Sequence, residues 1–387
     1  MDVEFAVVGA GVVGLSIAHR LAAAGRETLV VSAPGAAPRA SRAAAGMLAP
    51  SFEKPLADGR LAAAVHALGY DALDMWRGFA ADLEAASGVG VDYQADGILL
   101  VDEGPGELDA VASASAGRAD RIDAGDVAQL EPSLAPMAAG GVYAPGEGQV
   151  DPVLVVDALE AACRSKKVQF IERFIASIEE NTGGGFALAG ASGERPATAR
   201  AVILASGASP LQRMIGPDAP FMEAIKGEAL SLKRAGTRVG AHAGGLRRVV
   251  RSKGAYLCPK GDGRVVVGAS EVRGCRDIAP DGEAIARLKD NALRLCPSLE
   301  TAAVSSSWAG LRPGTSDGAP VLGPAPGFNG GLIYALGHYR NGILFAPRTA
   351  ALVSDWLLTK NAAAAAAMAP FAAERFANAS AAARVHA

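Results

Sequence analysis

FAVVGAGVVGLSIAHRLAAAGRETLVV, residues 5–31, carries the pattern that says most about the fold. Its pattern predicts an apolar strand, a glycine turn over residues 9–14, a helix closed by Gly25 and a second strand parallel to the first. The spacing Gly-x-Gly-x-x-Gly in this setting is the fingerprint of dinucleotide binding. The first glycine permits the tight turn, the second lets a pyrophosphate approach the backbone, and the third lets the helix pack closely on the sheet. The helix start then offers N–H donors and a positive dipole end to the phosphates of a dinucleotide.

The second strand of this unit ends without an expected acid. Proteins of this kind usually place Asp or Glu there to hold the hydroxyls of the adenosine ribose. This chain has Ser32 at that position, with Arg39 and Arg42 close behind. Taken alone, the loop favours a 2′-phosphate and therefore NADP, so the choice of dinucleotide depends on the rest of the chain.

Length and composition limit the class of protein. A chain of 387 residues exceeds the usual size of one domain core, so we expect two domains or one elaborated α/β unit. Hydrophobic residues make up 50% of the chain, but no apolar run reaches the roughly 18 residues that a membrane span needs. The formal net charge of −3 offers no electrostatic footprint for nucleic acid or anionic lipid. We therefore expect a soluble protein that binds neither nucleic acid nor membranes.

The start of the chain and its cysteines both indicate the cytoplasm. Asp2 and Glu4 lead directly into the first predicted strand, which is unlike a secretory signal. The cysteines are far apart and form no Cys-x-x-Cys pair, so we predict buried thiols in a reducing compartment. The histidines show no ligand spacing with acids or cysteines, and the sequence predicts no metal site. The four cysteines are Cys163, Cys258, Cys275 and Cys296.

Several segments beyond the first unit predict regular structure. Residues 61–86, 281–296 and 341–359 have helical spacing, and Asp151 followed by Pro152 is typical of a helix start.

The strands divide into two kinds. ARAVILASGAS, residues 199–209, is apolar throughout, as in a buried parallel sheet, whereas residues 222–305 predict a mostly antiparallel sheet. We expect an α/β fold with a Rossmann-like, glutathione-reductase-like nucleotide-binding domain and an inserted substrate domain built on a mostly antiparallel β-sheet. The predicted division gives 1–88, 149–220 and 306–387 to the nucleotide-binding domain, and 89–148 and 221–305 to the substrate domain.

Three further stretches identify the dinucleotide through a resemblance. They are SRAAAGMLAP (41–50), SWAGLRPGTSDGAPVLGP (307–324) and GHYRNGILFAP (337–347), of which the last is the most specific. Together with the glycine turn they resemble the D-amino-acid oxidase superfamily of FAD-dependent oxidoreductases. Within it they look most like the glycine oxidases associated with thiamine biosynthesis. The resemblance runs from about residue 3 to residue 358.

The resemblance implies FAD as the cofactor. None of the four cysteines lies in the matching segments, so we expect the flavin to be bound non-covalently. The residues predicted to hold it are Gly9, Gly11, Val12, Val13, Gly14, Ser32, Ala33, Ser41, Ala45, Gly46, Met47, Ile175, Gly207, His338, Tyr339, Arg340, Asn341, Gly342, Ile343 and Leu344.

The chemistry of the flavin accounts for two of these stretches. In GHYRNGILFAP a buried strand ends at Gly337 and a helix begins near Asn341, and such a helix start presents N–H donors and a positive dipole end. Donors placed near N1 and C2=O favour the reduced flavin, which is anionic there. The small residues of AAAGM allow the backbone to approach the flavin ring closely. An ordinary loop and buried helix would be the alternative explanation.

Two arginines are the candidates for binding a substrate. Arg312 and Arg340 stand in apolar, glycine-rich surroundings, where a guanidinium needs a partner because burying a lone charge is costly. A carboxylate is the natural bidentate partner. The resemblance assigns Arg312 as the carboxylate anchor and places Arg340 at the substrate. The alternative for both is an internal salt bridge to Asp317 or Glu271.

Two further side chains take their roles from the resemblance. Tyr256 matches a tyrosine whose hydroxyl binds the substrate carboxylate, although a core or edge tyrosine is the alternative. His338 is expected to be a neighbour of the flavin and not a general base, because an amine with a free lone pair can transfer hydride directly to flavin N5.

The predicted function is therefore FAD-dependent oxidation of glycine or a similar small amino acid by O2, by way of an imine. Three alternatives remain open at this point. They are a related dehydrogenase that reduces a carrier or a quinone, an NADP-dependent reductase, and a non-catalytic nucleotide-binding module. The resemblance also implies a homotetramer.

Ser32 takes a different meaning within an FAD site. The resemblance implies a glutamate there with two charge-assisted bonds to the ribose, whereas a serine hydroxyl makes one neutral bond. The difference is on the order of 1–2 kcal/mol, or about tenfold in affinity. We therefore expect this protein to bind FAD more loosely than relatives that have the acid.

Overall fold

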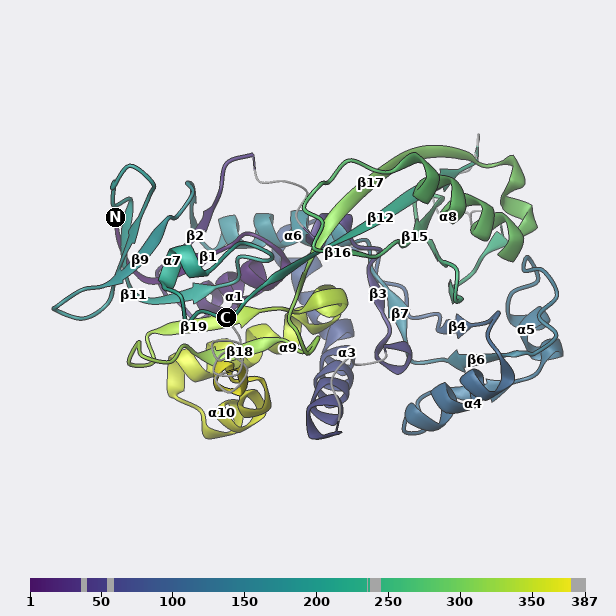
Figure 1. Cartoon of the computed structure of the whole chain (residues 1–387), viewed down its shortest axis with the longest axis horizontal. Coiled ribbons are helices and arrows are strands. Elements are labelled where there is room, and N and C mark those ends of the chain that lie inside the picture. The colour runs from purple at the N-terminus through teal and green to yellow at the C-terminus, as the bar shows by residue number, and fades with distance from the viewer. Residues whose placement is uncertain (36–39, 54–58, 235, 237–244, 377–387) are drawn as a thin grey trace, which may run out of the picture.

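The computed structural model describes residues 1–35, 40–53, 59–234, 236 and 245–376. Two large β-sheets organise this part of the chain and lie towards opposite ends of its long axis (Figure 1). The result is an α/β fold with mixed sheets, as the sequence predicts.

The first sheet is built around β1 (Asp2–Val8), whose mostly apolar residues are buried. β1 pairs in parallel with β2 (Thr28–Ser32) on one side and with β11 (Ala197–Leu204) on the other, which confirms the predicted strand–helix–strand unit. Its order is β18-β19-β11-β1-β2-β8, with β10 and β9 attached to β11. The remaining strands are β8 (Gln169–Glu172), β9 (Ser177–Glu180), β10 (Phe186–Ala189), β18 (Val321–Pro324) and β19 (Leu332–Leu336).

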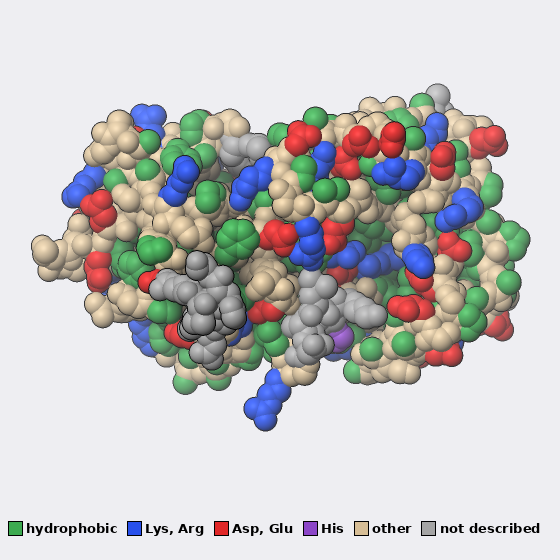
Figure 2. Space-filling model, in the orientation of Figure 1, with side chains coloured by type: hydrophobic (Ala, Val, Ile, Leu, Met, Phe, Trp, Pro, Cys, Tyr) green, Lys and Arg blue, Asp and Glu red, His purple; other side chains and the backbone are tan. Residues whose placement is uncertain are grey.

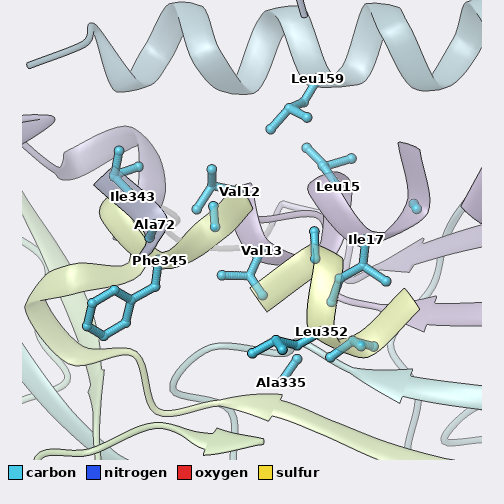
Figure 3. Close-up of a cluster of buried hydrophobic side chains, with 14 of the residues drawn as sticks. Val12, Val13, Leu15, Ile17, Ala72, Leu159, Ala335, Ile343, Phe345 and Leu352 are labelled. Carbon is cyan, nitrogen blue, oxygen red and sulfur yellow. The ribbon is translucent and has the colours of Figure 1, made fainter. Parts of the chain in front are cut away.

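Helices α1 (Val12–Ala23), α3 (Gly59–Ser87), α6 (Pro152–Ser165) and α9 (Gly342–Thr359) pack together beside this sheet. Figure 3 shows Val12, Val13 and Leu15 of α1 among side chains of α6 and α9. Trp76 of α3 is fully buried, and its indole N–H donates to Leu344 O at 2.9 Å. This core fixes the amino terminus of α1 relative to that of α9.

The predicted helix boundaries are close to the observed ones. Gly25 has φ +75°, as expected for a glycine that ends a helix. Asp151 caps α6 by accepting a hydrogen bond from Val153 N at 2.9 Å, and Pro152 is the first residue of the helix. The other helices are α2 (Ala40–Ala43), α4 (Pro105–Ala114), α5 (Ala124–Leu130), α7 (Gln212–Ile215), α8 (Gly282–Leu295) and α10 (Ala362–Met368).

The second sheet is mostly antiparallel, as predicted, and is dominated by two long strands. β12 (Glu223–Lys233) and β17 (Ala303–Gly314) pair along almost their whole length and cross the middle of the molecule (Figure 1). β14 (Tyr256–Pro259) and β15 (Arg264–Gly268) form the predicted hairpin. The other strands are β4 (Ile98–Leu100), β5 (Asp120–Ile122), β6 (Gly141–Ala144), β13 (Val249–Arg251) and β16 (Val272–Arg273).

The domain bounds set out above remain predictions. β17 runs across the predicted boundary at 305/306 and pairs with β12 throughout, so it is part of the second sheet. A small two-stranded ladder, β3 (Met47–Leu48) with β7 (Gly148–Gln149), joins the segments that precede α3 and α6.

Acidic and basic side chains are mixed over the face shown in Figure 2, and neither sign covers it continuously. Among the described residues, no helix is long and apolar enough to cross a membrane.

Candidate cofactor and substrate site

A cavity of about 500 Å³ lies where the two sheets meet. One side is formed by the carboxyl ends of parallel strands of the first sheet, which is where open α/β sheets bind their ligands. The other side is formed by strands β12, β14 and β17 of the second sheet. The residues that line it from these strands and their ends include Val8, Ser32, Ala205, Leu336, Gly227, Tyr256 and Arg312.

The cavity wall contains nearly all of the residues predicted to bind cofactor or substrate. Two predicted cofactor residues lie outside it: Gly14 packs behind the glycine turn, and Leu344 is buried in the core with 1% of its surface exposed. Those that line the cavity are Gly9, Gly11, Val12, Val13, Ser32, Ala33, Ser41, Ala45, Gly46, Met47, Ile175, Gly207, Tyr256, Arg312, His338, Tyr339, Arg340, Asn341, Gly342 and Ile343.

The glycine turn has the close contacts that its motif predicts. Gly9 has φ +120°, and a Cβ there would lie 2.2 Å from Ala205 O. A Cβ on Gly14 would lie 2.1 Å from Gly9 O, so this glycine allows helix α1 to pack against the turn. At the start of α1, Val12 N donates to Ser41 Oγ at 3.0 Å, which ties the segment around Ser41 to the turn.

Residues 43–47, the AAAGM segment, are held in place by hydrogen bonds from other parts of the chain. Trp308 Nε1 donates to Ala43 O at 3.0 Å, Lys260 Nζ to Ala45 O at 2.7 Å, and Val150 N to Gly46 O at 2.9 Å. Burial lowers the pKa of Lys260, whose ammonium donates further to Val150 O and Gln149 Oε1. Sequence reasoning missed Lys260, which looks like an ordinary turn residue of the hairpin.

The residues of this cavity fit a dinucleotide. Gly9 and Gly46 let the backbone of the cavity wall pack closely, because a Cβ at either position would meet a backbone oxygen, at 2.2 and 2.1 Å. Ser206, which follows β11 and lines the cavity, has a buried hydroxyl for which the described residues offer no hydrogen-bond partner. An orphaned polar atom of this kind indicates that a ligand supplies the partner.

Arg312 lies at the end of the cavity formed by the second sheet. Its Nη1 donates to Ser270 O at 3.1 Å and to Lys226 O at 3.4 Å, and both acceptors are neutral carbonyls. Neither predicted acidic partner is in contact with it: Asp317 pairs with Arg375 at 2.7 Å, and Glu271 accepts from the Tyr339 hydroxyl at 2.6 Å. No salt bridge of Arg312 occurs within the described ranges, so its charge faces the cavity without a carboxylate.

Arg340 has a different environment. Its Nε lies 3.6 Å from Glu53 Oε2, and Glu53 also accepts from Arg251 Nη1 at 2.9 Å. Burial alone would raise the pKa of Glu53, but Arg251 and Arg340 hold it below its ordinary value, so the carboxylate is ionised. Sequence reasoning missed Glu53, because a lone acid carries no signal of its two distant partners.

Two further side chains complete this end of the cavity. Burial raises the pKa of Tyr256 to about 12, so its hydroxyl is a hydrogen-bond donor at neutral pH. Burial lowers the pKa of His338 to about 4, and its Nε2 lies 3.1 Å from Thr349 Oγ1. His338 is therefore neutral at neutral pH, as expected of a buried neighbour of the cofactor.

Ser32, which stands where an acid was expected, lies at the other end of the cavity. Ser32 ends β2 there, and Arg173, which directly follows the neighbouring strand β8 and whose N donates to Ser32 O at 2.8 Å, also lines the cavity. Arg42 is turned elsewhere, since it pairs with Asp157 at 2.7 Å. Arg39 lies outside the described residues.

The model of the family of FAD-dependent oxidoreductases known as DAO matches residues 4–356. The chain belongs to the DAO family. FAD is accordingly the cofactor for which the cavity is built, and the described residues that line the cavity include no cysteine.

Several members of the DAO family resemble the whole chain. Glycine oxidase from Bacillus licheniformis is 30% identical, and the match covers 91% of this chain and 92% of that protein. Glycine oxidase from Pseudomonas putida is 32% identical, and the match covers 92% of this chain and 95% of that protein. The bifunctional protein ThiO/ThiG of Synechocystis is 35% identical over 91% of this chain, which spans about half (51%) of that protein's length. The crystal structure of glycine oxidase from Geobacillus kaustophilus superposes with a TM-score of 0.84 at 28% identity, covering 94% of this chain and 96% of that one.

Restoring the acid in this DAO-family site is expected to tighten FAD binding. Ser32→Glu should lower the dissociation constant of FAD about tenfold, because a carboxylate makes two charge-assisted bonds to the ribose where the hydroxyl makes one neutral bond. Fluorescence titration of the apoprotein with FAD measures the change, and Ser32→Gln, which has the same length without the charge, is the matched control. An unchanged affinity in Ser32→Glu would rule out this explanation of Ser32.

Proposed function

We propose that this enzyme oxidises glycine or a similar small amino acid with O2. The balanced reaction is glycine + O2 + H2O to glyoxylate + NH3 + H2O2, with an imine released for hydrolysis. The observation that carries the proposal is Arg312, a cavity-facing guanidinium without a carboxylate partner, in a DAO-family site. Relatives named glycine oxidase, matched over more than nine-tenths of both chains, support the choice of substrate.

The residues at this end of the cavity have complementary roles. The Arg312 guanidinium binds the substrate carboxylate, and the protonated Tyr256 hydroxyl donates a second bond to it. Arg340 also lies at the substrate end of the cavity, with its charge balanced by Glu53. A cationic environment favours the neutral form of the substrate amine, which is the form that gives up its electrons.

When bound, FAD would supply the acceptor for the two electrons of the substrate α C–H bond and the route by which they reach O2. The protein positions the α-carbon and excludes water from the cavity. His338 donates no proton and accepts none in this scheme, because it is neutral and bonded to Thr349.

Oxygen is the preferred acceptor in this proposal. A dehydrogenase that reduces a carrier was the alternative, and the glycine oxidase relatives favour the oxidase. We place the product in thiamine biosynthesis, as the resemblance implies, and the match to a ThiO/ThiG protein supports that assignment.

Purified protein is expected to be yellow, to release FAD when denatured, and to produce hydrogen peroxide with glycine. A peroxidase-coupled assay and an oxygen electrode measure the two sides of the reaction in the same preparation. Colourless protein that binds NADP would contradict the proposal. Protein that glycine bleaches under nitrogen, but that regains its colour only slowly in air, would identify a dehydrogenase. The same assay with sarcosine, D-alanine and D-proline ranks the substrates.

The proposed assembly follows from the resemblance, and the proposed location follows from the start of the chain and its cysteines. We propose a homotetramer in the cytoplasm. Light scattering coupled to size-exclusion chromatography tests the assembly, and a monomer at micromolar concentration would contradict it.

A further inference from the structure

The guanidinium of Arg312 rests on the backbone of the neighbouring strand. Gly227 of β12 lies beneath it, and a Cβ there would come within 2.1 Å of Arg312 Nη1 and 2.2 Å of Cζ. Nη1 makes both hydrogen bonds to the protein, to Lys226 O and Ser270 O. Within the described residues Nε and Nη2 have no partner, so they are the donors left for a carboxylate.

The Ser270 carbonyl accepts the shorter of the two hydrogen bonds from Arg312 Nη1. Ser270 is itself held by Glu228. The Ser270 hydroxyl donates to Glu228 Oε2 at 2.6 Å and accepts from Glu228 N at 2.9 Å. Ser270 N donates to Glu228 O at 3.3 Å. Three bonds therefore join these two residues, and Glu228 follows Gly227 directly in the chain.

Glu228 is buried, with 2% of its surface exposed, and its second oxygen is also used. Oε1 accepts from Asp281 N at 2.7 Å and lies 3.2 Å from Lys226 Nζ. Lys226 Nζ donates further to Ala279 O at 2.7 Å and to Asp277 Oδ2 at 3.4 Å. Burial alone would raise the pKa of Glu228, but the bonds from Ser270 and Asp281 and the Lys226 ammonium hold it low, so Glu228 is ionised.

We propose that Glu228 and Ser270 are positioning residues for Arg312, and that they set the affinity for the substrate carboxylate without touching the substrate. This inference rests on the proposed function of Arg312. The ionised Glu228 holds the Ser270 hydroxyl, which aims the Ser270 carbonyl at Arg312 Nη1. The guanidinium is then held flat over Gly227 with its free edge towards the cavity. Arg312 is still present when the Ser270 hydroxyl or the Glu228 charge is removed. Its guanidinium can then rotate away from the orientation that binds a carboxylate through two bonds.

The test compares Ser270→Ala and Glu228→Gln with Ser270→Thr, which keeps the hydroxyl. Ser270→Ala and Glu228→Gln are expected to raise the apparent KM for glycine about tenfold, with kcat within about twofold of wild type and FAD affinity unchanged. Ser270→Thr is expected to behave like wild type. Ser231→Ala is the matched control, because it removes a buried serine hydroxyl of β12, the strand of Glu228, that contacts Ser305 and Ser306 instead of this network.

Glycolate provides a readout that is independent of turnover. It carries the carboxylate but no amine, and its binding is measured from the change in flavin absorbance. Its dissociation constant should rise by the same factor as KM in Ser270→Ala and Glu228→Gln. An unchanged constant in both variants, or an equal loss in Ser231→Ala, would overturn the inference while leaving the proposed function intact. A wild-type enzyme that binds glycolate but produces no peroxide with glycine would instead overturn the proposed function, and one that binds no small carboxylate would overturn both.

Discussion

Replacing Arg312 with alanine is expected to raise the apparent KM for glycine by about 30-fold or more. Removing one partner of a hydrogen-bonded charge pair costs about 2–5 kcal/mol, and each 1.4 kcal/mol is about tenfold in affinity. Arg312 lines the cavity and makes no salt bridge with the described residues, so its guanidinium is available to the substrate carboxylate. Arg340 cannot take over this role, because Glu53 lies 3.6 Å from its Nε and already balances its charge.

Steady-state kinetics over a wide range of glycine concentration measures this effect. Arg312→Lys, which keeps the charge and loses the bidentate geometry, is expected to fall between the alanine variant and wild type. Arg42→Ala is the matched control, since Arg42 pairs with Asp157 outside the cavity. A wild-type KM in Arg312→Ala would show that the carboxylate is anchored elsewhere.

Gly46→Ala is expected to weaken FAD binding by about 30-fold or more. Gly46 has φ +84°, and a Cβ there would lie 2.1 Å from Val150 O and 2.9 Å from Pro152 Cδ. A backbone clash of this kind, added to a left-handed conformation, costs on the order of 2–4 kcal/mol. We expect the segment 45–47 to relieve the clash by moving away from Val150 and towards the cavity, into the space that the cofactor needs.

Titration of the apoprotein with FAD, together with thermal unfolding, measures the consequence. Gly25→Ala provides the matched control, because Gly25 also has a positive φ, +75°, but no heavy atom would lie within 4 Å of the new Cβ. It should lose some stability and keep its FAD affinity. If Gly46→Ala binds FAD as tightly as Gly25→Ala, the close packing at residue 46 does not shape the cofactor site.

The local parts of the fold were predictable from the sequence because their causes are local. The apolar strand, the glycine turn and helix α1 follow from residues that are neighbours in the chain. The cap of α6 is a side chain bonded to the backbone two residues away. The same holds for the hairpin of β14 and β15, whose turn residues and alternation lie within one short stretch.

The partners of the candidate site residues were not predictable in this way. Arg251 and Glu53 are 198 residues apart, and Lys260 reaches Ala45 across 215 residues. Asp317 was a predicted partner of Arg312, but in the folded chain it pairs with Arg375. The position of the Arg312 guanidinium over Gly227 depends on the pairing of β12 with β17. No pattern within either strand specifies that pairing.

Three features could be inferred from the sequence alone: the nucleotide-binding unit, a second and mostly antiparallel sheet, and the residue types that belong near a flavin and a carboxylate. Which charges remain available for a ligand depends on the tertiary structure. Glu53 balances Arg340, while Arg312 meets two neutral carbonyls and keeps its charge for the cavity. The physical reason is that secondary structure follows from short-range backbone and side-chain preferences, whereas the charge of a site depends on groups brought together by packing.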